Sequence, residues 1–382
     1  MQNITFPVGS LQLHNDPNFN YQLNRTALWG GGDVDEIRDI AGKITDTQSW
    51  ESELLALGNK AENEGRMQQA IAYYRMAEFF MFDDNPNKLP TYKKAKAMFY
   101  DYHKAIFDSG KIQRDLIPYE KGFMPIWICK PESKSKGTIV FHGGFDSYME
   151  ELLYGVLYIA EQGYTVYLFE GPGQGAARRE YGLSFTHEWH KPVGAVLDHF
   201  DLDYVTLVGI SLGGVLAPRA VAFEKRIKRV VGWSILPNFL DVILSTRPPM
   251  IQKIARLCLK LHFKAFLKLT FKVQMRRDQM VKWGIIHGMY SFGAKSPYEY
   301  MKKADQLQIA DIGSKIDQDF LLIGAEHDHF IKKELYKDEI DALTNVRSLC
   351  YRLFTEKENA DTHCNVGNTK LVLDFILNWI QE

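Results

Sequence analysis

The sequence YVTLVGISLGGVLAPRAVAFEKRI (residues 204–227) joins a short apolar run, a G-x-S-x-G motif and a helix-length segment. We expect a strand over 204–208, a sharp turn that carries Ser211, and a helix after the turn. Such a turn lifts the serine hydroxyl clear of a sheet, and the N-terminus of the helix favours negative charge beside it. Ser211 is therefore the first candidate nucleophile. The alternative is a serine that only caps a helix.

Similar apolar, β-branched runs recur on both sides of this motif. They cover residues 137–141, 164–169, 229–233, 320–323 and 349–354. Helix-length segments separate most of them, and this alternation is typical of a mostly parallel sheet with helices on both faces. Open sheets of this class bind ligands at the carboxyl ends of their strands, so we expect the active site at that edge.

The first 115 residues are expected to form a separate helical domain. Apolar residues have helical spacing over 47–65, 67–82 and 92–107, whereas residues 1–46, which include three consecutive glycines at 30–32, are expected to be irregular. Two helices joined at Gly65 resemble one tetratricopeptide unit. Because such arrays need at least about three repeats and no second copy is present, we do not favour a solenoid.

A long segment without a strand pattern interrupts the predicted sheet. Residues 236–315 lie between two core strands, and a loop of this length is improbable, so we expect an inserted helical cap. The predicted core is then 116–235 together with 316–382. Over 256–276 every odd position is apolar, which is formally a strand pattern, but the length and the Leu, Lys and Arg content favour a helix. We expect this helix to be largely covered.

The same stretch is strongly basic. Lysine or arginine recurs every four residues from Arg256 to Arg276, with no acidic residue between Asp241 and Asp278. The simplest interpretation is a solvated face. The alternatives are attraction of an anionic ligand, of an acidic carrier protein or of a membrane surface.

A serine nucleophile needs a histidine to take its proton and a carboxylate to orient that histidine. In a sheet of this kind the three follow the chain order Ser, acid, His. Asp328 follows the strand at 320–323, and His363 follows the last predicted strand, so Ser211, Asp328 and His363 satisfy that order. The competing carboxylates are those of Glu326 and Asp319, which lie nearer the body of the strand. The competing imidazoles are those of His327 and His329, which we expect to lie at the surface or along the pocket.

An oxyanion hole is expected beside the serine. His142-Gly143-Gly144-Phe145 follows the strand at 137–141, where this architecture supplies one amide donor, and the residue after the serine supplies the other. The candidate donors are therefore the amides of Leu212 and of Gly144 or Phe145. The alternative is a simple turn that requires glycine.

Two further motifs point away from cofactors. Glu170-Gly-Pro-Gly-Gln-Gly175 has neither of the common nucleotide-loop spacings, and His187-Glu-Trp-His190 is not H-E-x-x-H. We therefore expect no cofactor and no metal, and we interpret residues 170–175 as a tight turn beside the site. Aromatic residues in the cap are candidates for a substrate pocket, with core packing as the alternative: Trp283, Tyr290, Phe292 and Tyr298.

The composition and the terminal sequence bear on nucleic-acid binding, secretion and membrane insertion. Lys and Arg number 46 and Asp and Glu 47, so the formal charge of −1 gives no general attraction to nucleic acid. Four cysteines without C-x-x-C spacing favour a reducing compartment. We find neither a signal-peptide pattern nor a transmembrane run of apolar residues, which predicts a cytoplasmic protein.

The expected ligand is a small carbonyl compound, and a homodimer is left open.

The motifs together resemble one family. The resemblance rests on Gly143-Gly144-Phe145 with Glu150-Glu151, the 170–175 turn, Trp189 with Pro192-Val193, Gly209–Gly214, and His363-Cys364 followed by Gly367-Asn368. From about residue 49 to the end, the chain is similar to an α/β-hydrolase subgroup with a helical N-terminal domain. This subgroup includes FrsA-like esterases, 2,6-dihydroxypseudooxynicotine hydrolase and polyketide-shortening hydrolases of pigment pathways.

The resemblance implies an α/β-hydrolase fold whose triad is Ser211, Asp328 and His363 and whose active site lies between the helical domain and the sheet. Members of the subgroup cleave esters or a carbon–carbon bond beside a carbonyl. The segment 236–315 is longer than expected for the nicotine-degrading member, so the substrate is not carried over. We expect a cofactor-independent serine hydrolase; the alternatives are a carboxylesterase or thioesterase, and a non-catalytic interaction protein.

Overall fold

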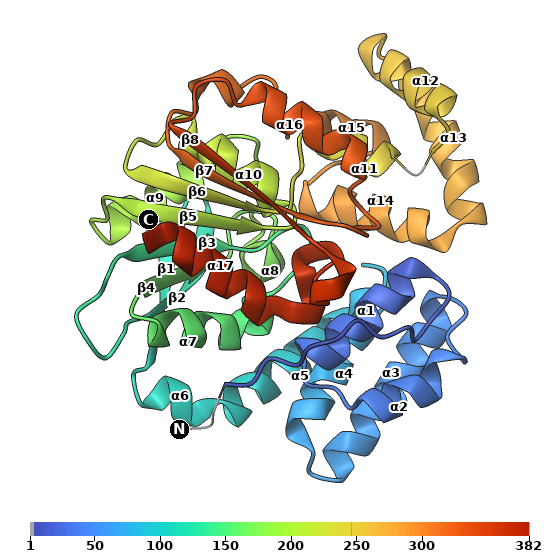
Figure 1. Ribbon diagram of the computed structural model, residues 1–382. Helices are drawn as coiled ribbons and strands as arrows, with labels where there is room; N and C mark the ends of the chain where they lie inside the picture. Colours follow the sequence, from blue (N-terminus) through green and yellow to red (C-terminus); the bar gives the residue numbers. More distant parts are fainter. Residues whose placement is uncertain (1–3, 246, 382) are drawn as a thin grey trace.

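The structure is a computed structural model that describes residues 4–245 and 247–381. A mostly parallel sheet of eight strands lies at its centre, in the order β1-β2-β4-β3-β5-β6-β7-β8 (Figure 1). The strands are β1 Ile112–Tyr119, β2 Gly122–Cys129, β3 Thr138–His142, β4 Thr165–Phe169, β5 Val205–Ile210, β6 Ile227–Trp233, β7 Asp319–Ala325 and β8 Ser348–Phe354. β1 and β2 are antiparallel to their neighbours, and the other pairs are parallel. The predicted fold class is confirmed.

The sheet has a hydrophobic core on each face, because successive side chains of a strand point to opposite sides. On β3, Ile139 and Phe141 belong to one core and Val140 to the other. The first core is completed by α7 (Leu153–Glu161) and α17 (Thr369–Gln381), and the second by α9 (His190–His199) and α10 (Gly213–Val221). Burial on both faces explains why the central strands are nearly continuous apolar runs.

The six expected strands are present, but the sequence analysis missed β1 and β2. These strands form a hairpin in which Tyr119 pairs with Gly122, so only Glu120 and Lys121 make the turn. Glu120 has a φ of 48°, a conformation that glycine or asparagine usually supplies in such turns. Because the expected Asn-Gly signal is missing, the hairpin was not recognised. The sheet therefore begins at Ile112, before the boundary expected at 116.

The N-terminal region is helical from its start. Its helices are α1 Pro17–Leu28, α2 Val34–Ala41, α3 Thr47–Asn63, α4 Met67–Phe79, α5 Lys88–Tyr102 and α6 Lys104–Asp108. The expectation that residues 1–46 are irregular is wrong, since α1 and α2 lie there. The carboxylates of Asp16 and Asp33 cap these two helices by accepting backbone amides at their N-termini. Trp50, Phe80 and neighbouring apolar residues give this region a core of its own.

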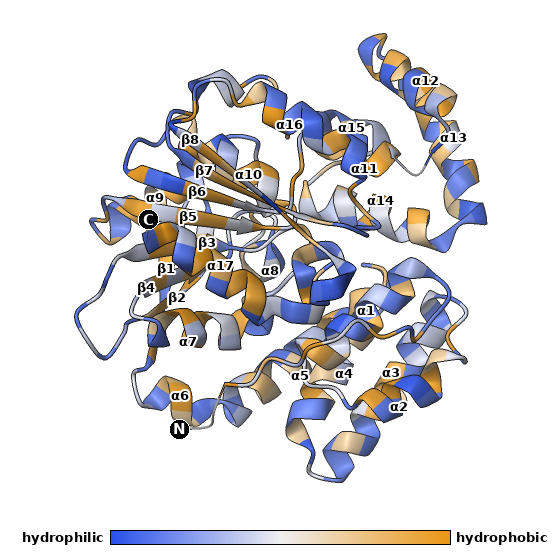
Figure 2. Cartoon of the chain, in the orientation of Figure 1, coloured by the Kyte–Doolittle hydropathy of each residue, from blue (hydrophilic) through white to orange (hydrophobic). Residues whose placement is uncertain are grey.

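Helices also form the segment between β6 and β7: α11 Phe239–Leu244, α12 Pro249–Lys260, α13 Lys264–Arg277, α14 Gln279–Ser291 and α15 Pro297–Asp305. The preference for helix over strand at 256–276 is confirmed, but the helix is not continuous. It breaks at residues 261–263, where His262 has a φ of 57°. The expected covering of this stretch is also wrong, because Leu257 and Leu269 are 53% and 62% exposed. Figure 2 shows apolar and polar residues interleaved along both helices.

Two kinds of feature are not found in the part of the chain that the structure describes. None of the helices over 4–245 and 247–381 is long and apolar enough to cross a membrane. Within the same residues, no group of three or more His, Cys, Asp or Glu side chains is arranged to hold a metal ion.

Candidate active site

Ser211 lies at the sharp turn between β5 and α10. Its φ of 61° is in the left-handed region, and its amide donates to the Trp233 carbonyl at 2.9 Å. The turn depends on glycine: a Cβ on Gly209 would lie 2.2 Å from the Gly213 oxygen, and one on Gly214 would lie 1.9 Å from the Ser234 oxygen. The motif therefore fixes the backbone around the serine.

His363 reaches Ser211 from the loop after β8. Its Nε2 lies 2.8 Å from the Ser211 Oγ. The loop is held by Asn365, whose side chain accepts from the Trp233 indole at 2.9 Å and donates to the Ala360 carbonyl. Cys364 and Asn365 both have a positive φ, so the chain turns sharply directly after the histidine.

Asp328 follows β7 and lies on the other side of the imidazole. Its Oδ2 is 2.7 Å from the His363 Nδ1, and its Oδ1 accepts the amides of Phe330 and Ile331 at 2.9 and 3.0 Å. Both carboxylate oxygens are thus engaged, and the Asp328 side chain is only 3% exposed. Ser211, His363 and Asp328 form one continuous hydrogen-bonded line.

His363 and Asp328 each shift the pKa of the other so that the charged form is favoured. Burial of His363 works to lower its pKa, but the Asp328 carboxylate outweighs burial and raises the pKa of the imidazole well above its ordinary value. Burial likewise works to raise the pKa of Asp328, but the neighbouring His363 holds it below its usual range. The geometry favours an ionised carboxylate that fixes the imidazole tautomer with Nδ1 protonated, leaving Nε2 to accept a proton from the serine.

None of the competing residues forms part of this hydrogen-bonded line. Asp319 begins β7 and pairs with Arg347, and Glu326 accepts the Glu356 amide at 3.3 Å. His327 contacts Asp361 at 2.9 Å. His329 packs against Phe330 with ring centroids 3.9 Å apart and the ring planes tilted by 40°, and burial lowers the pKa of His329 to about 4.

The loop after β3 packs directly against the serine. A Cβ on Gly144 would lie 2.7 Å from the Ser211 Cβ, so glycine is needed there for close approach. The Gly144 amide donates to the Ser147 Oγ at 3.1 Å. Within the described residues no protein acceptor is recorded for the amides of Leu212 and Phe145. Of the candidate donors, these two are therefore the ones available to a ligand.

Gln174 and His287 support this loop, and the sequence analysis did not single out either of them. Gln174, in the turn at 170–175, donates to the carbonyls of Gly143 and Gly144 at 2.7 and 3.1 Å. The His287 Nε2 lies 3.1 Å from the Phe145 carbonyl. Because burial lowers the pKa of His287 to about 4, its imidazole is neutral near pH 7 and donates this hydrogen bond through Nε2.

A largely buried ionic network, here called the junction cluster, joins the N-terminal helices to the same loop. Its members are Arg25, Arg75, Glu78 and Lys88 from the helices and Asp146, Glu151 and Arg179 from the core. Arg25 contacts Asp146 at 3.0 Å and Glu151 at 2.6 Å. Burial works to raise the pKa of Glu78, but Lys88, Arg179 and Arg75 lower it to about 2. The cluster thus anchors the residue after Phe145.

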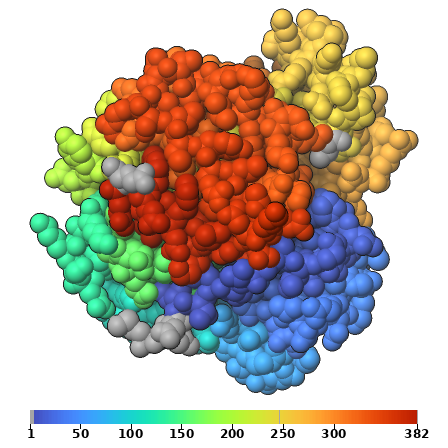
Figure 3. Space-filling model, in the orientation of Figure 1, coloured from blue at the N-terminus to red at the C-terminus, as the bar shows by residue number. Residues whose placement is uncertain are grey.

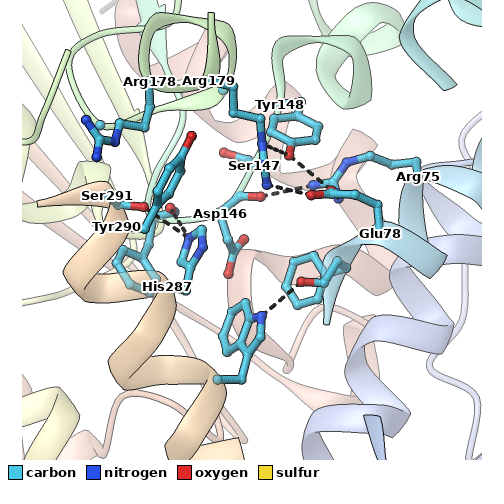
Figure 4. Close-up of a pocket in the computed structure, with 15 residues that line it drawn as sticks. Arg75, Glu78, Asp146, Ser147, Tyr148, Arg178, Arg179, His287, Tyr290 and Ser291 are labelled. Atoms are coloured by element: carbon cyan, nitrogen blue, oxygen red, sulfur yellow. Dashed lines mark hydrogen bonds and ion pairs between the residues drawn. The ribbon is translucent and has the colours of Figure 1, made fainter. Parts of the chain in front are cut away.

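A cavity opens beside this loop, at the junction of the N-terminal helices, the core and α14 (Figure 4). The free space between its lining residues, including the part that is open to solvent, is about 350 Å³. Arg75 and Glu78 lie on one side of it and His287 and Tyr290 on the other. Ser211 is not among the lining residues, but Phe145 is, and it directly follows Gly144, which packs against Ser211.

The four aromatic candidates of the cap divide into two pairs. Trp283 and Tyr290 line the cavity. Phe292 is outside its lining and packs in the core beside Phe185, with ring centroids 4.9 Å apart. Tyr298 is also outside it, and its hydroxyl lies 2.7 Å from the His262 Nδ1.

Comparison with known families agrees with this arrangement. The model of the α/β-hydrolase fold family matches residues 139–358, which is more than half of the chain. The chain belongs to the α/β-hydrolase fold family. The matched region spans β3 to the residues after β8 and includes Ser211 and Asp328.

Relatives extend the similarity into the N-terminal helices. The chain is 28% identical to hydrolase acrC of Aspergillus aculeatus, over 86% of this chain and 83% of acrC. It is 25% identical to 20-hydroxy-prefusarin hydrolase FUS2 of Gibberella moniliformis, over 95% of this chain and 96% of FUS2. These relatives are named hydrolases, which together with the fold agrees with the prediction that the chain is an enzyme.

Solved structures support the same architecture. The 2,6-dihydroxy-pseudo-oxynicotine hydrolase superposes with a TM-score of 0.66 at 18% identity, covering 93% of this chain and 94% of that one. At this identity the match shows a shared fold. The resemblance predicted from the sequence motifs is confirmed at that level.

Proposed function

We propose that the chain is a cofactor-independent serine hydrolase that cleaves an ester, or a carbon–carbon bond next to a carbonyl, through an acyl-enzyme. The observation that carries this proposal is the hydrogen-bonded line from Ser211 through His363 to Asp328, with distances of 2.8 and 2.7 Å. In this assignment Ser211 is the nucleophile, His363 the general base and then acid, and Asp328 the group that orients His363.

The first half of the reaction forms the acyl-enzyme. The Ser211 Oγ attacks the substrate carbonyl carbon while its proton passes to the His363 Nε2. The amides of Leu212 and Phe145 donate to the resulting oxyanion, which Gly144 cannot do while its amide is bonded to Ser147. The bond to the leaving group then breaks, and His363 returns the proton to an alkoxide or, for a β-dicarbonyl substrate, to an enolate.

In the second half, His363 takes a proton from water, and the hydroxide oxygen attacks the acyl carbon. The bond to the Ser211 Oγ breaks, the serine recovers its proton from His363, and a carboxylic acid leaves. The cavity beside Phe145, with Trp283 and Tyr290 in its lining, is proposed to hold the part of the substrate next to the reacting carbonyl.

The bond that is cleaved can be tested with paired substrates. Purified protein is incubated with p-nitrophenyl esters and with benzoylacetone, and the products are measured by liquid chromatography and mass spectrometry. We expect turnover of both classes, and a loss of about 10⁴-fold or more in Ser211→Ala. Turnover of esters alone assigns a carboxylesterase or thioesterase activity. A Ser211→Ala variant that keeps full activity on either class would contradict the mechanism.

A further inference from the structure

The helices α12 and α13, here called the outer hairpin, expose an unusual amount of apolar surface. Half of the large hydrophobic side chains that are exposed in the described structure lie within residues 250–273. On α12 and just beyond it they are Met250, Ile251, Ile254, Leu257 and Leu261, and further along they are Phe263, Phe266, Leu269 and Val273. In Figures 1 and 3 this hairpin stands out from the body of the molecule.

These exposed side chains recur at helical spacing. Met250, Ile254, Leu257 and Leu261 are spaced by three or four residues, as are Phe266, Leu269 and Val273, so each set follows one side of its helix. A second apolar stripe on each helix is buried: Ala255 and Cys258 on α12, and Leu267 and Phe271 on α13. The inner stripes account for packing of the hairpin onto the cap. The outer stripes contribute nothing to that packing, because they face away from it.

The outer hairpin is also the most basic part of the chain. Residues 242–277 hold nine of its 46 Lys and Arg residues and none of its 47 Asp and Glu residues. Arg256 pairs with Asp241 and Asp305 from outside this stretch. Among the residues that the structure describes, no ion pair to a carboxylate is recorded for Lys253, Lys260, Lys264, Lys268 or Lys272. Because the whole chain has a formal charge of −1, the residues outside 242–277 together carry a net negative formal charge.

We propose that the outer hairpin docks the protein onto an anionic phospholipid surface. A lipid interface offers an apolar layer for the outer stripes and, just above it, negative headgroups for the lysines that flank them. Long lysine side chains can reach such headgroups while their stems lie along the apolar layer. Since the remainder of the molecule is net negative, an anionic surface attracts this end most strongly, which favours one orientation of docking.

The orientation has a consequence for the cap. α13 ends at Arg277 and α14 begins at Gln279, and α14 carries Trp283, His287 and Tyr290 of the cavity lining. Docking by the hairpin thus holds the cavity-lining helix next to the lipid without adding any contact to Ser211 or His363.

Vesicle sedimentation tests the proposal with the full-length protein. We expect the wild type to sediment with phosphatidylcholine vesicles that contain about one-third phosphatidylglycerol, and to stay in solution with phosphatidylcholine alone. Sodium chloride should release it. Leu257→Glu with Leu269→Glu should lower the partition coefficient about tenfold or more, because both side chains belong to the outer stripes.

The matched control carries the same change on two other exposed leucines, Leu116→Glu with Leu349→Glu, and should sediment like the wild type. Circular dichroism and turnover of a soluble ester should be unchanged in both double variants, which excludes unfolding. A wild type that ignores anionic vesicles, or that binds neutral vesicles equally well, overturns the proposal. Sedimentation velocity without lipid provides the other decisive outcome: a dimer that Leu257→Glu with Leu269→Glu dissociates would assign the stripes to a second copy of the chain instead.

Discussion

The junction cluster and the outer hairpin use the same residue types in opposite ways. In the junction cluster, Arg25 is buried, the Arg75 side chain is only 12% exposed, and each contacts a carboxylate. Glu78 is only 1% exposed between its partners. In the outer hairpin, lysines and large apolar side chains lie together in solvent. The first region has its partners within the chain, whereas the second presents charge and apolar area outward.

This difference separates a structural role from a docking role. A buried charge that loses its partner leaves an uncompensated ion, so the junction cluster should tolerate little change. Substitution of exposed side chains changes the stability of the isolated protein very little, so the outer stripes of the hairpin should tolerate substitution and show an effect only when their ligand is present.

The largest effect on stability is expected from Glu78→Gln. The change leaves Lys88, Arg75 and Arg179 with less negative charge in a buried site, and should cost about 3–5 kcal/mol in the free energy of unfolding, measured by urea denaturation. The matched change Glu299→Gln, in a partly exposed pair with Lys303, should cost less than about 1 kcal/mol. Equal costs would remove the distinction between the two regions.

Within α13, Leu267→Ala and Leu269→Ala form a matched pair. Leu267 is 3% exposed on the inner stripe and Leu269 is 62% exposed on the outer one. The first substitution should destabilise by about 2–5 kcal/mol and the second by about 0.5 kcal/mol or less, again by urea denaturation. A large cost at Leu269 would mean that the outer stripe is covered in the free protein.

The junction cluster should also affect turnover. Asp146→Asn weakens the contact of Arg25 with the loop that carries Phe145, and should lower kcat by up to about 100-fold with a smaller change in KM. Asp311→Asn is the control, because Asp311 likewise pairs with a buried arginine, Arg219, but lies outside this loop. If Asp146→Asn leaves kcat unchanged, the cluster stabilises the fold without positioning the oxyanion donors.

The smallest expected effect is a displacement of the pH profile. Asp328 raises the pKa of His363, so the neutral imidazole needed as a base forms only above the ordinary value of about 6.5. The kcat/KM of the wild type should therefore rise with pH through an apparent pKa above 6.5. Stability has the opposite sign: the favourable contact of protonated His363 with Asp328 is fully present below about pH 6.5 and is lost as pH rises through the folded-state pKa. A rising limb at or below 6.5 would contradict this assignment.

Much of the site could be predicted from the sequence, because strand ends of a parallel sheet converge. Ser211, Asp328 and His363 each follow a recognisable strand, and this alone brought them to one edge. The choice between Gly144 and Phe145 as donor could not be made, since it depends on the hydrogen bond from Gly144 to Ser147.

Long-range partners were inaccessible for a different reason. The contact of Arg25 with Asp146 joins positions 121 residues apart, and no local pattern marks it. For residues 256–276 the alternation formally indicates a strand, and the length and the Leu, Lys and Arg content correctly favoured a helix. Neither signal reveals whether the outer face of that helix is covered. The β1–β2 hairpin was missed because Glu120 occupies a position where glycine or asparagine is the usual signal.

The assignment of Ser211 as the nucleophile can be tested most directly by labelling with a fluorophosphonate, followed by peptide mass spectrometry. We predict one adduct per chain, on Ser211, that forms at least about 10³-fold more slowly in His363→Ala. Circular dichroism should establish that both proteins are folded. An adduct on another residue, or none on the folded wild type, would contradict the account.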